Sequence, residues 1–380
     1  MPRMHVVTTT INLPTFLNSY RENLDAFGHT RDVKFWVVGD LRTPPEANDA
    51  VANQVRRGLN AEYLSPEAQR RWLADFPDLA AIIPWNSDNR RNVGFLRALQ
   101  EHCEVLFSVD DDNYCTPTSD FYAGHADTGR SLRMAIATSD NGWYNLCSQL
   151  TMEPDVPVVP RGFPHAERYG RISFLGEGGI RLAATAGLWL GDPDVDAATR
   201  LACPVRAVSH KGSPVALALG TWSPINTQNT SIARRAIPAY YYVRMLERFS
   251  DLLLDRYGDI WSGYFLQCCA THLGESVAVG QPIVDHRRNR HDLLTDLRAE
   301  LWGMILTPRL VSMLRSVNLS GVDYSEVVTS LSRALESFAQ PLEANVGLVG
   351  VADYLRRIGA SLRIWVDVCS AVGGHALEMN

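Results

Sequence analysis

The sequence predicts an α/β fold in which helices flank a central sheet. The first observation is a strand–helix–strand pattern: residues 5–10 and 33–38 are β-prone, and residues 14–27 carry apolar side chains at helical spacing. This order is typical of a parallel α/β sheet. The second observation is an apolar run at residues 105–109 that leads directly into three aspartates. The third is a series of amphipathic stretches after residue 292, which predicts a helical C-terminal region.

The composition is that of an ordinary globular protein and argues against several classes. Of 380 residues, 46% are hydrophobic and 21% are charged, and this length allows one large domain or two. The formal net charge of −6 argues against a dedicated nucleic-acid-binding protein, whose surface would be basic. No run of ~18 apolar residues is present, so we expect no membrane span.

Cysteine usage indicates a reducing compartment. The seven cysteines are scattered, odd in number and without a CxxC pair. This pattern favours reduced, mostly buried thiols over a disulfide framework or a zinc site. The first residues also lack the apolar segment of a signal peptide. We therefore expect a cytoplasmic protein.

The chain is expected to divide into residues 1–291 and residues 292–380. The second part contains three amphipathic stretches, at 292–316, 324–339 and 346–371, and shows no convergent set of polar residues. We expect it to cover the sheet or to contact another copy of the chain, which makes a homo-oligomer reasonable.

Two further elements are expected in the first part. Residues 79–84 form a short apolar run that suggests another strand. Residues 240–254 show the spacing of an amphipathic helix, and a further helix is expected to open around residue 259.

The three adjacent aspartates are the strongest chemical signal. Asp110, Asp111 and Asp112 repel one another at the end of an apolar strand unless a cation lies among them. Alternate side chains of a strand share a face, so Asp110 and Asp112 are candidates to bind Mg²⁺ or Mn²⁺ through oxygen. Ligands of open α/β sheets bind at the carboxyl ends of the strands. The alternative is a solvated turn that happens to be acidic.

Residues near this strand favour a site for a phosphorylated ligand. Arg90 and Arg91 stand at the start of a helix just before the acidic strand, where they suit a polyanion such as a diphosphate. A basic surface turn is the alternative. Asp40 follows the second strand, at a position where such folds often hold a nucleotide's base or ribose, and it is equally well a turn residue.

Polar residues farther along the chain extend this pattern. Residues 221–230 are rich in amides and hydroxyls, which suit the hydroxyl groups of a sugar. Asp259 falls in the first turn of the expected helix, where capping is the strong alternative. His286 lies among arginines and is a candidate to complete a metal site, while Arg288 would neutralise phosphate.

These motifs, in this order, resemble the reversibly glycosylated polypeptides, a family of flavin-independent nucleotide-sugar mutases that interconvert pyranose and furanose rings. The resemblance covers about residues 5–290. It rests on motifs that the chain carries in sequence: Arg91-Asn-Val-Gly94, Val109-Asp-Asp-Asp112, Arg161-Gly-Phe-Pro164 with Arg168, Gly187-Leu-Trp-Leu with Pro193-Asp-Val-Asp-Ala197, Asn229, Asp259-Ile-Trp261-Ser-Gly263 and His286.

The resemblance implies a fold and a set of site residues. The fold would be a glycosyltransferase A-type (Rossmann-like) mixed sheet flanked by helices. Asp110 and Asp112 would bind the metal, with His286 as a further ligand. The catalytic residues would be Arg168, which matches the arginine that becomes glycosylated, with Asp259 and Asp194. Substrate-binding residues would be Thr9, Asp40, Arg90, Arg91, Asp111, Arg161, Trp189, Asn229 and Arg288.

Two departures from the family pattern bear on substrate preference. The family commonly has paired acids before the tryptophan, whereas here Gly258 precedes Asp259. The segment after His286 is also more basic than in the plant members. Either difference affects which nucleotide or sugar the site accepts.

The expected function is a metal-dependent mutase acting on a UDP- or GDP-linked sugar, of which galactose is one candidate. Mn²⁺ or Mg²⁺ is expected as cofactor, with neither flavin nor NAD, because ring isomerisation needs no redox step. The expected partner is a nucleotide-diphosphate sugar, not nucleic acid or a membrane. One alternative is a glycosyltransferase that uses the same donor site, and another is a non-catalytic, self-glycosylated carrier subunit.

Overall fold

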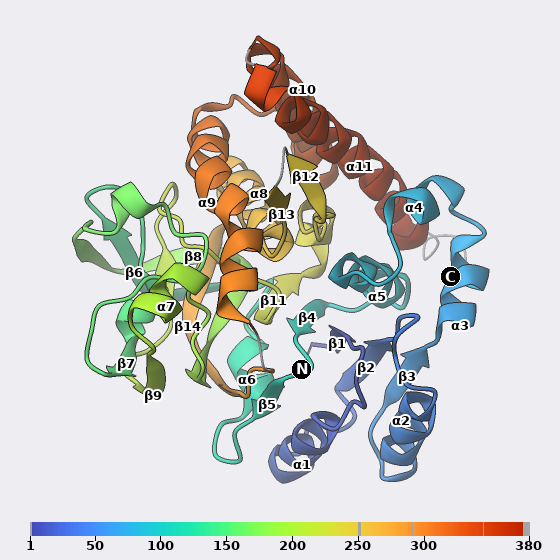
Figure 1. Cartoon of the computed structure of the whole chain (residues 1–380). Coiled ribbons are helices and arrows are strands. Elements are labelled where there is room, and N and C mark those ends of the chain that lie inside the picture. The colour runs from blue at the N-terminus through green and yellow to red at the C-terminus, as the bar shows by residue number, and fades with distance from the viewer. Residues whose placement is uncertain (1, 250–251, 290–291, 345, 375–380) are drawn as a thin grey trace.

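The computed structural model describes residues 2–249, 252–289, 292–344 and 346–374. Within these ranges one twelve-stranded sheet runs in the order β3-β2-β1-β4-β11-β8-β6-β10-β14-β5, with β7 and β9 attached beside it (Figure 1). Its strands are β1 Met4–Thr9, β2 Val33–Val38, β3 Ala61–Leu64, β4 Val105–Val109, β5 Asn113–Cys115, β6 Ser131–Ser139, β7 Leu150–Glu153, β8 Ile172–Gly191, β9 Arg206–His210, β10 Val215–Leu217, β11 Asn229–Ala233 and β14 Ser276–His286. A separate hairpin joins β12 Glu247–Phe249 to β13 Leu252–Leu254.

Helices cover the sheet and fill the C-terminal part. The α-helices are α1 Leu17–Phe27, α2 Glu46–Arg56, α3 Pro66–Leu73, α4 Pro77–Ile82, α5 Arg91–Gln100, α6 Phe121–His125, α7 Ala197–Ala202, α8 Gly258–His272, α9 Leu293–Ser316, α10 Tyr324–Glu343 and α11 Val349–Gly374. Short 3₁₀ turns are η1 Asp88–Arg90, η2 Leu146–Gln149, η3 His165–Glu167, η4 Arg234–Ala239 and η5 Val346–Leu348.

The strand directions confirm the predicted mixed α/β sheet. β1 pairs in parallel with β2 and β4, and β2 pairs in parallel with β3. β11 then runs antiparallel to both β4 and β8. Because β1, β2 and β4 are parallel, Thr9, Asp40 and Asp110 all stand at the same edge of the sheet. This edge is where ligands of such folds bind.

The acidic strand is anchored in the core. Every residue of β4 is buried. Behind it, Tyr20 of α1 packs edge-on against Phe35 and Phe121, and Phe107 of β4 contacts the Phe121 ring as well. Burial of this aromatic cluster fixes the position at which the chain leaves β4 and turns into the three aspartates.

The helical C-terminal region is confirmed and packs against the first part of the chain. The expected boundary after residue 291 falls outside the described residues, and α9 begins at Leu293 with Asp292 as its N-cap. α10 and α11 run side by side across the top of the molecule in Figure 1, and α11 reaches α4 and α5. Trp365 of α11 stacks near Tyr241 and donates a hydrogen bond to the Pro238 carbonyl at 3.1 Å.

Two expected elements are wrong. Residues 79–84 belong mainly to helix α4, whose first residue is Pro77; proline is favoured at that position because its missing N–H needs no partner there. Residues 240–254 do not form a helix. The amide and carbonyl of Tyr242 bond to the side chain of Asn92 instead, and Leu246 adopts a φ of 67°, so the backbone turns and enters the β12–β13 hairpin.

Candidate active site

A cleft of about 660 Å³ opens at the carboxyl edge of β1, β2 and β4. Four residues predicted to bind substrate line it: Thr9, Asp40, Arg90 and Asp111. Its other walls come from the 86–88 turn, Leu246, Asp255 and Asn289. These four residues therefore meet in one cleft at this edge of the sheet.

Two carboxylates of the cleft are held by nearby donors. Asp40 accepts hydrogen bonds from the backbone amides of Leu41, Asn86 and Ser87 at 2.7, 2.8 and 3.1 Å. It therefore orders the turn that forms one wall. Asp111 accepts a 2.6 Å hydrogen bond from the Thr10 hydroxyl and a longer one from the Asn12 amide.

Arg91 holds the first aspartate of the acidic stretch. Its Nη1 lies 2.7 Å from Asp110 Oδ1, and the guanidinium also donates to the Thr9 hydroxyl at 3.0 Å. Arg91 is only 3% exposed. Its guanidinium is therefore placed to orient Asp110 and has little contact with solvent. Enclosure raises the pKa of Asp110 to about 6, and the neighbouring Asp112 adds to this, while Arg91 opposes it.

His286 faces the third aspartate. Its Nδ1 contacts the Asp192 carbonyl, an interaction that leaves Nε2 directed at Asp112 Oδ2, 3.4 Å away. Burial would raise the pKa of Asp112, but the His286 imidazole outweighs burial and lowers it. A carbonyl that fixes one ring nitrogen and frees the other is the usual support for a metal-binding histidine.

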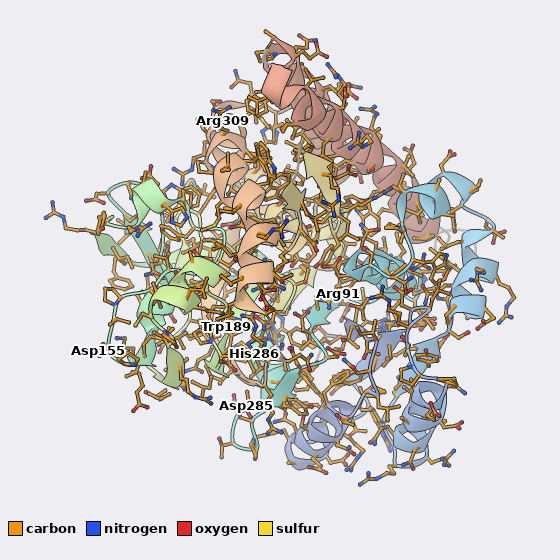
Figure 2. The ribbon with its side chains drawn as sticks, viewed as in Figure 1. Arg91, Asp155, Trp189, Asp285, His286 and Arg309 are labelled. Atoms are coloured by element: carbon orange, nitrogen blue, oxygen red, sulfur yellow. The ribbon has the colours of Figure 1, made fainter. Side chains whose placement is uncertain are left out.

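The donor chemistry of these residues fits a divalent cation. Carboxylate oxygens and an imidazole nitrogen suit Mn²⁺ or Mg²⁺, and like-charged Asp110 and Asp112 gain from a cation between them. The side chains are nevertheless turned to protein partners: within the described ranges, no three His, Cys, Asp or Glu side chains are gathered in a metal-binding arrangement. Figure 2 shows His286, Trp189 and Arg91 in the central part of the molecule.

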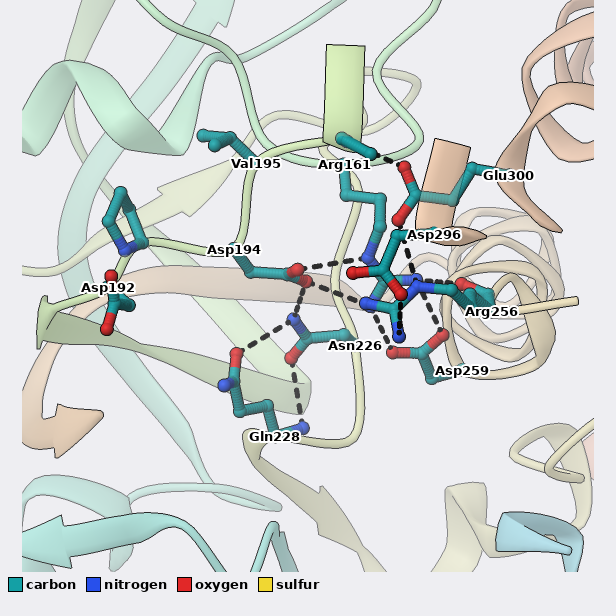
Figure 3. A network of polar contacts seen from close by, with 12 residues as sticks. Arg161, Asp192, Asp194, Val195, Asn226, Gln228, Arg256, Asp259, Asp296 and Glu300 are labelled. Carbon is teal, nitrogen blue, oxygen red and sulfur yellow. Dashed lines mark hydrogen bonds and ion pairs between the residues drawn. The ribbon is translucent and has the colours of Figure 1, made fainter. Parts of the chain in front are cut away.

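Arg161 lies between two buried carboxylates and forms the centre of a polar network (Figure 3). Its Nε and Nη2 lie 2.9 and 3.1 Å from the two oxygens of Asp194, and its Nη2 and Nη1 lie 2.8 and 3.2 Å from those of Asp259. Burial alone would lower the pKa of Arg161, but the charges of Asp194 and Asp259 outweigh burial and raise it. Asp259 is thus paired with an arginine rather than serving only as a helix cap.

Amide side chains connect this network to the acidic strand. Asn226 donates a 2.6 Å hydrogen bond to Asp194 Oδ2, and its side chain also lies 3.5 Å from Gln228. The Gln228 carbonyl accepts a hydrogen bond from the Asp110 amide. Asn226 and Gln228 were not predicted as site residues, although they belong to the amide-rich turn that the sequence singled out.

The C-terminal region contributes to the network, contrary to the expectation that it lacks convergent polar residues. Arg161 donates to the carbonyl of Arg256, and Arg256 Nε lies 2.9 Å from Glu300 Oε1 on α9. Asp296, one turn earlier on α9, pairs with Arg256 at 3.5 Å and with Arg288 at 2.7 Å. Arg288, predicted to bind phosphate, is thus bound to a carboxylate in this structure.

Glu300 fixes both sides of the network, and its removal should weaken the fold. Its second oxygen accepts a 2.7 Å hydrogen bond from the Ala197 amide, directly after the segment that carries Asp194. Glutamine keeps the size but turns an N–H toward one of the two donors. We expect Glu300→Gln to lower the free energy of unfolding by about 1–3 kcal/mol in urea denaturation, the cost of an unsatisfied buried group. The half-exposed Glu336→Gln serves as control, and equal losses in the two variants would contradict this role.

Three predicted residues belong neither to the cleft, nor to the acidic stretch and its partners, nor to the network around Arg161. Arg168 is exposed and bonds only locally, with its Nε 2.9 Å from the His165 carbonyl. Trp189 is buried in the core. Asn229 is buried too, and its amide group bonds to the carbonyls of Leu188 and Pro282 and to His125, contacts that favour a structural role.

The fold and the site define an α/β protein with an acidic cleft at the carboxyl edge of its mixed sheet. The chain belongs to the reversibly glycosylated polypeptide family, whose sequence model matches residues 157–373. UDP-arabinopyranose mutase 1 of Arabidopsis thaliana is 24% identical over 292 residues, which span 76% of this chain and 74% of that one. A probable UDP-arabinopyranose mutase 1 of Pisum sativum is 23% identical over 305 residues, spanning 79% and 76%. Both relatives are named as enzymes, and the expectation that this protein is an enzyme is confirmed.

Solved structures show a more distant likeness. S. aureus TarS 1–349 in complex with UDP-GlcNAc aligns with a TM-score of 0.43 and 11% identity, over 99% of this chain and 92% of that one. Glucosyl-3-phosphoglycerate synthase from Mycobacterium tuberculosis, in complex with Mn²⁺ and UDP-glucose, aligns with a TM-score of 0.38 and 12% identity, over 80% and 78%. Likeness at this level carries no argument about the site. No helix of the described ranges has the length and hydropathy needed to cross a membrane.

Proposed function

We propose that this protein is a nucleotide-sugar mutase that interconverts the pyranose and furanose forms of a UDP- or GDP-linked sugar. One observation carries the proposal: Arg161, from a motif shared with the family, lies between Asp194 and Asp259 and is linked through amides to the acidic end of β4. A guanidine that is to accept a sugar must give up a proton to a base within hydrogen-bond reach. Two carboxylates are within that reach, although they hold Arg161 protonated before the sugar arrives.

The diphosphate of the substrate would lie beside the acidic stretch. Asp112 and His286 would hold a divalent ion there, joined by Asp110 once it turns from Arg91. Such an ion, when bound, neutralises charge on the departing diphosphate. Arg90 lines the cleft, and its guanidinium stacks on Trp85 at 3.7 Å and donates to Gln69 and to the Ile83 carbonyl, so it would add a positive charge behind the cleft wall.

Arg161 is our choice for the sugar acceptor, although the resemblance pointed to Arg168. Arg168 has no carboxylate partner among the described residues, whereas Arg161 has two. In the proposed step, an Arg161 nitrogen forms a bond to C1 as the bond from C1 to the diphosphate breaks. The proton of that nitrogen passes to Asp194 or Asp259. The return of a diphosphate oxygen to C1 later releases the arginine, which takes its proton back from the carboxylate. The protein therefore ends with the charge it had at the start.

Isomerisation takes place while C1 remains on the arginine. The bond between C1 and the ring oxygen opens, the C4 hydroxyl adds to C1, and a five-membered ring results. No electron is gained or lost in these steps, so neither flavin nor NAD is needed.

The product decides between this function and its main rival. We expect purified protein with Mn²⁺ to convert at least one member of a panel of UDP- and GDP-linked pyranoses, galactose and arabinose included, into its furanose isomer without an acceptor. Chromatography of the nucleotide sugars measures this conversion. Sugar transfer to an added acceptor, with no isomer formed in its absence, would instead identify a glycosyltransferase that uses the same donor site.

A further inference from the structure

The isomerisation needs two proton movements that the residues discussed so far do not supply. The ring oxygen must receive a proton when its bond to C1 opens. The C4 hydroxyl must lose one when it closes on C1. These movements require an acid and a base that face the sugar, separate from the groups that serve the arginine.

Four carboxylates of the described residues line the cleft, and two of them hold neighbouring loops in place. Asp40 accepts from three backbone amides, and Asp111 accepts from Thr10 and Asn12. The remaining two are Asp88, at the start of η1, and Asp255, directly after β13. Neither was predicted as a site residue.

Asp255 is held in place by its backbone while part of its carboxylate stays free. Its amide donates to the Ala299 carbonyl of α9 at 2.9 Å, and its Oδ1 accepts from the Arg256 amide at 2.8 Å. Its Oδ2 has no hydrogen-bond or ion-pair partner within the described ranges. Asp88 accepts a 2.6 Å hydrogen bond from the Tyr242 hydroxyl at Oδ2 and a 3.3 Å hydrogen bond from the Ser87 hydroxyl at Oδ1, and its side chain is exposed at the cleft.

The backbone around these two residues is strained. Asn86, Leu246 and Arg256 have φ angles of 55°, 67° and 63°, and they are three of the four non-glycine residues with positive φ in the described ranges. Asn86 and Leu246 line the cleft, and Arg256 follows Asp255. Such conformations cost energy and persist where the surrounding structure enforces a particular placement, often at active sites.

Asp255 also lies close to the proposed sugar acceptor. Arg161 donates to the carbonyl of Arg256, the residue next to Asp255. A sugar bound through C1 to Arg161 would therefore have its ring near this end of the cleft.

We propose that Asp88 and Asp255 are the catalytic acid and base of ring isomerisation and share one proton between them. One gives its proton to the ring oxygen as the C1–O bond breaks. The other takes the proton of the C4 hydroxyl as its oxygen bonds to C1. One proton is given and one is taken, so the pair ends with the charge it had at the start. This assignment rests on the proposed mutase function.

The electrostatic setting agrees with a shared proton. Burial and the nearby charge of Asp88 raise the pKa of Asp255 to about 6. Arg256 and Arg161 face Asp255 and oppose this rise, and Arg256 is itself paired with Glu300 of α9. Burial and the charge of Asp259 raise the pKa of Asp88, while Tyr242, Arg91 and Ser87 oppose this rise. Two nearby carboxylates of like charge lose their protons in separate steps, which leaves one acid and one base over an intermediate pH range.

The test separates transfer of C1 from isomerisation. We expect Asp255→Asn to lower the rate of furanose formation by about 10²-fold or more, the usual contribution of general acid–base catalysis. Formation of the protein-bound sugar, followed by intact mass and by release of nucleoside diphosphate, should stay within about threefold of wild type, because C1 transfer does not use this proton. Asp88→Asn should behave in the same way. Asp155→Asn, an exposed aspartate far from Arg91 and His286 in Figure 2, is the matched control.

The pH profile gives a second readout that a structural role would not change. In wild type, kcat/KM should fall as pH rises through about 6, because the free protein then loses the shared proton. The residual kcat/KM of Asp255→Asn should not fall over this pH range. Isomerisation at the wild-type rate by Asp255→Asn, or loss of the protein-bound sugar together with the isomer, would overturn the assignment. A wild type that binds sugar covalently yet releases no isomer would overturn the mutase function, and this assignment with it.

Discussion

Replacement of Arg161 by lysine is expected to abolish furanose formation while the protein stays folded. Lysine keeps a positive charge near Asp194 and Asp259 but cannot satisfy both carboxylates, since the Arg161 guanidinium donates to both oxygens of each of them. If Arg161 is the sugar acceptor, kcat should fall by about 10³-fold or more, and no protein-bound sugar should form. Intact mass after incubation with the nucleotide sugar measures the adduct, and chromatography measures the isomer.

Comparison with Arg168→Lys identifies the acceptor. We expect Arg168→Lys to retain the adduct, because among the described residues this exposed arginine bonds only to His165. Arg309→Lys, at the periphery of the molecule on α9, controls for the substitution itself (Figure 2). An adduct that persists in Arg161→Lys and disappears in Arg168→Lys would return the role to Arg168.

Arg161→Ala would be a poorer test, because it removes the partner of two buried carboxylates. The loss of one partner from a buried ion pair costs about 3–5 kcal/mol, enough to unfold many domains. A lysine variant that unfolds at nearly the wild-type urea concentration keeps the catalytic interpretation separate from stability.

The second large effect is expected at the acidic stretch. The double variant Asp110→Asn with Asp112→Asn should lose turnover altogether and should also lose any dependence of nucleotide binding on Mn²⁺. Asparagine preserves size and a hydrogen-bond acceptor for Arg91 and His286 but removes the negative charges that a divalent ion requires. Isothermal titration with UDP and with GDP, each with and without Mn²⁺, measures the effect on binding.

Metal dependence of the wild type provides the control for this variant. Removal of metal with a chelator should stop wild-type turnover, and Mn²⁺ should restore it. If added Mn²⁺ changes neither wild type nor the double variant, Asp110, Asp112 and His286 do not form a metal site. Asp155→Asn should respond to Mn²⁺ as wild type does.

Local patterns in the sequence were sufficient to predict the elements that build the cleft. The strand–helix–strand start, the buried strand before Asp110 and the helix that begins near Asp259 are each determined by residues close together in the chain. Their apolar spacing reflects the same burial that the structure shows. The edge at which the site lies could also be predicted, because parallel strands present their carboxyl ends together.

Contacts between distant segments could not be predicted in the same way. Arg161, Asp194 and Asp259 each drew notice separately, but nothing in the sequence indicates that one guanidinium joins the two acids. Glu300 is a single acid on an amphipathic helix, a pattern that normally marks the solvent face, yet it is 1% exposed. Residues 240–254 show helical spacing, but side-chain amides replace the backbone bonds of a helix.

The position of α9 has a consequence for the order in which the protein becomes active. Glu300 and Asp296 complete the surroundings of Arg256, and through it of Arg161, from a helix near the C-terminal end. A ribosome-bound chain that has emerged only as far as β14 already contains Arg161, Asp194 and Asp259 but lacks these partners. The protein should therefore become able to bind and isomerise a sugar only late in synthesis, after most of the sheet has formed.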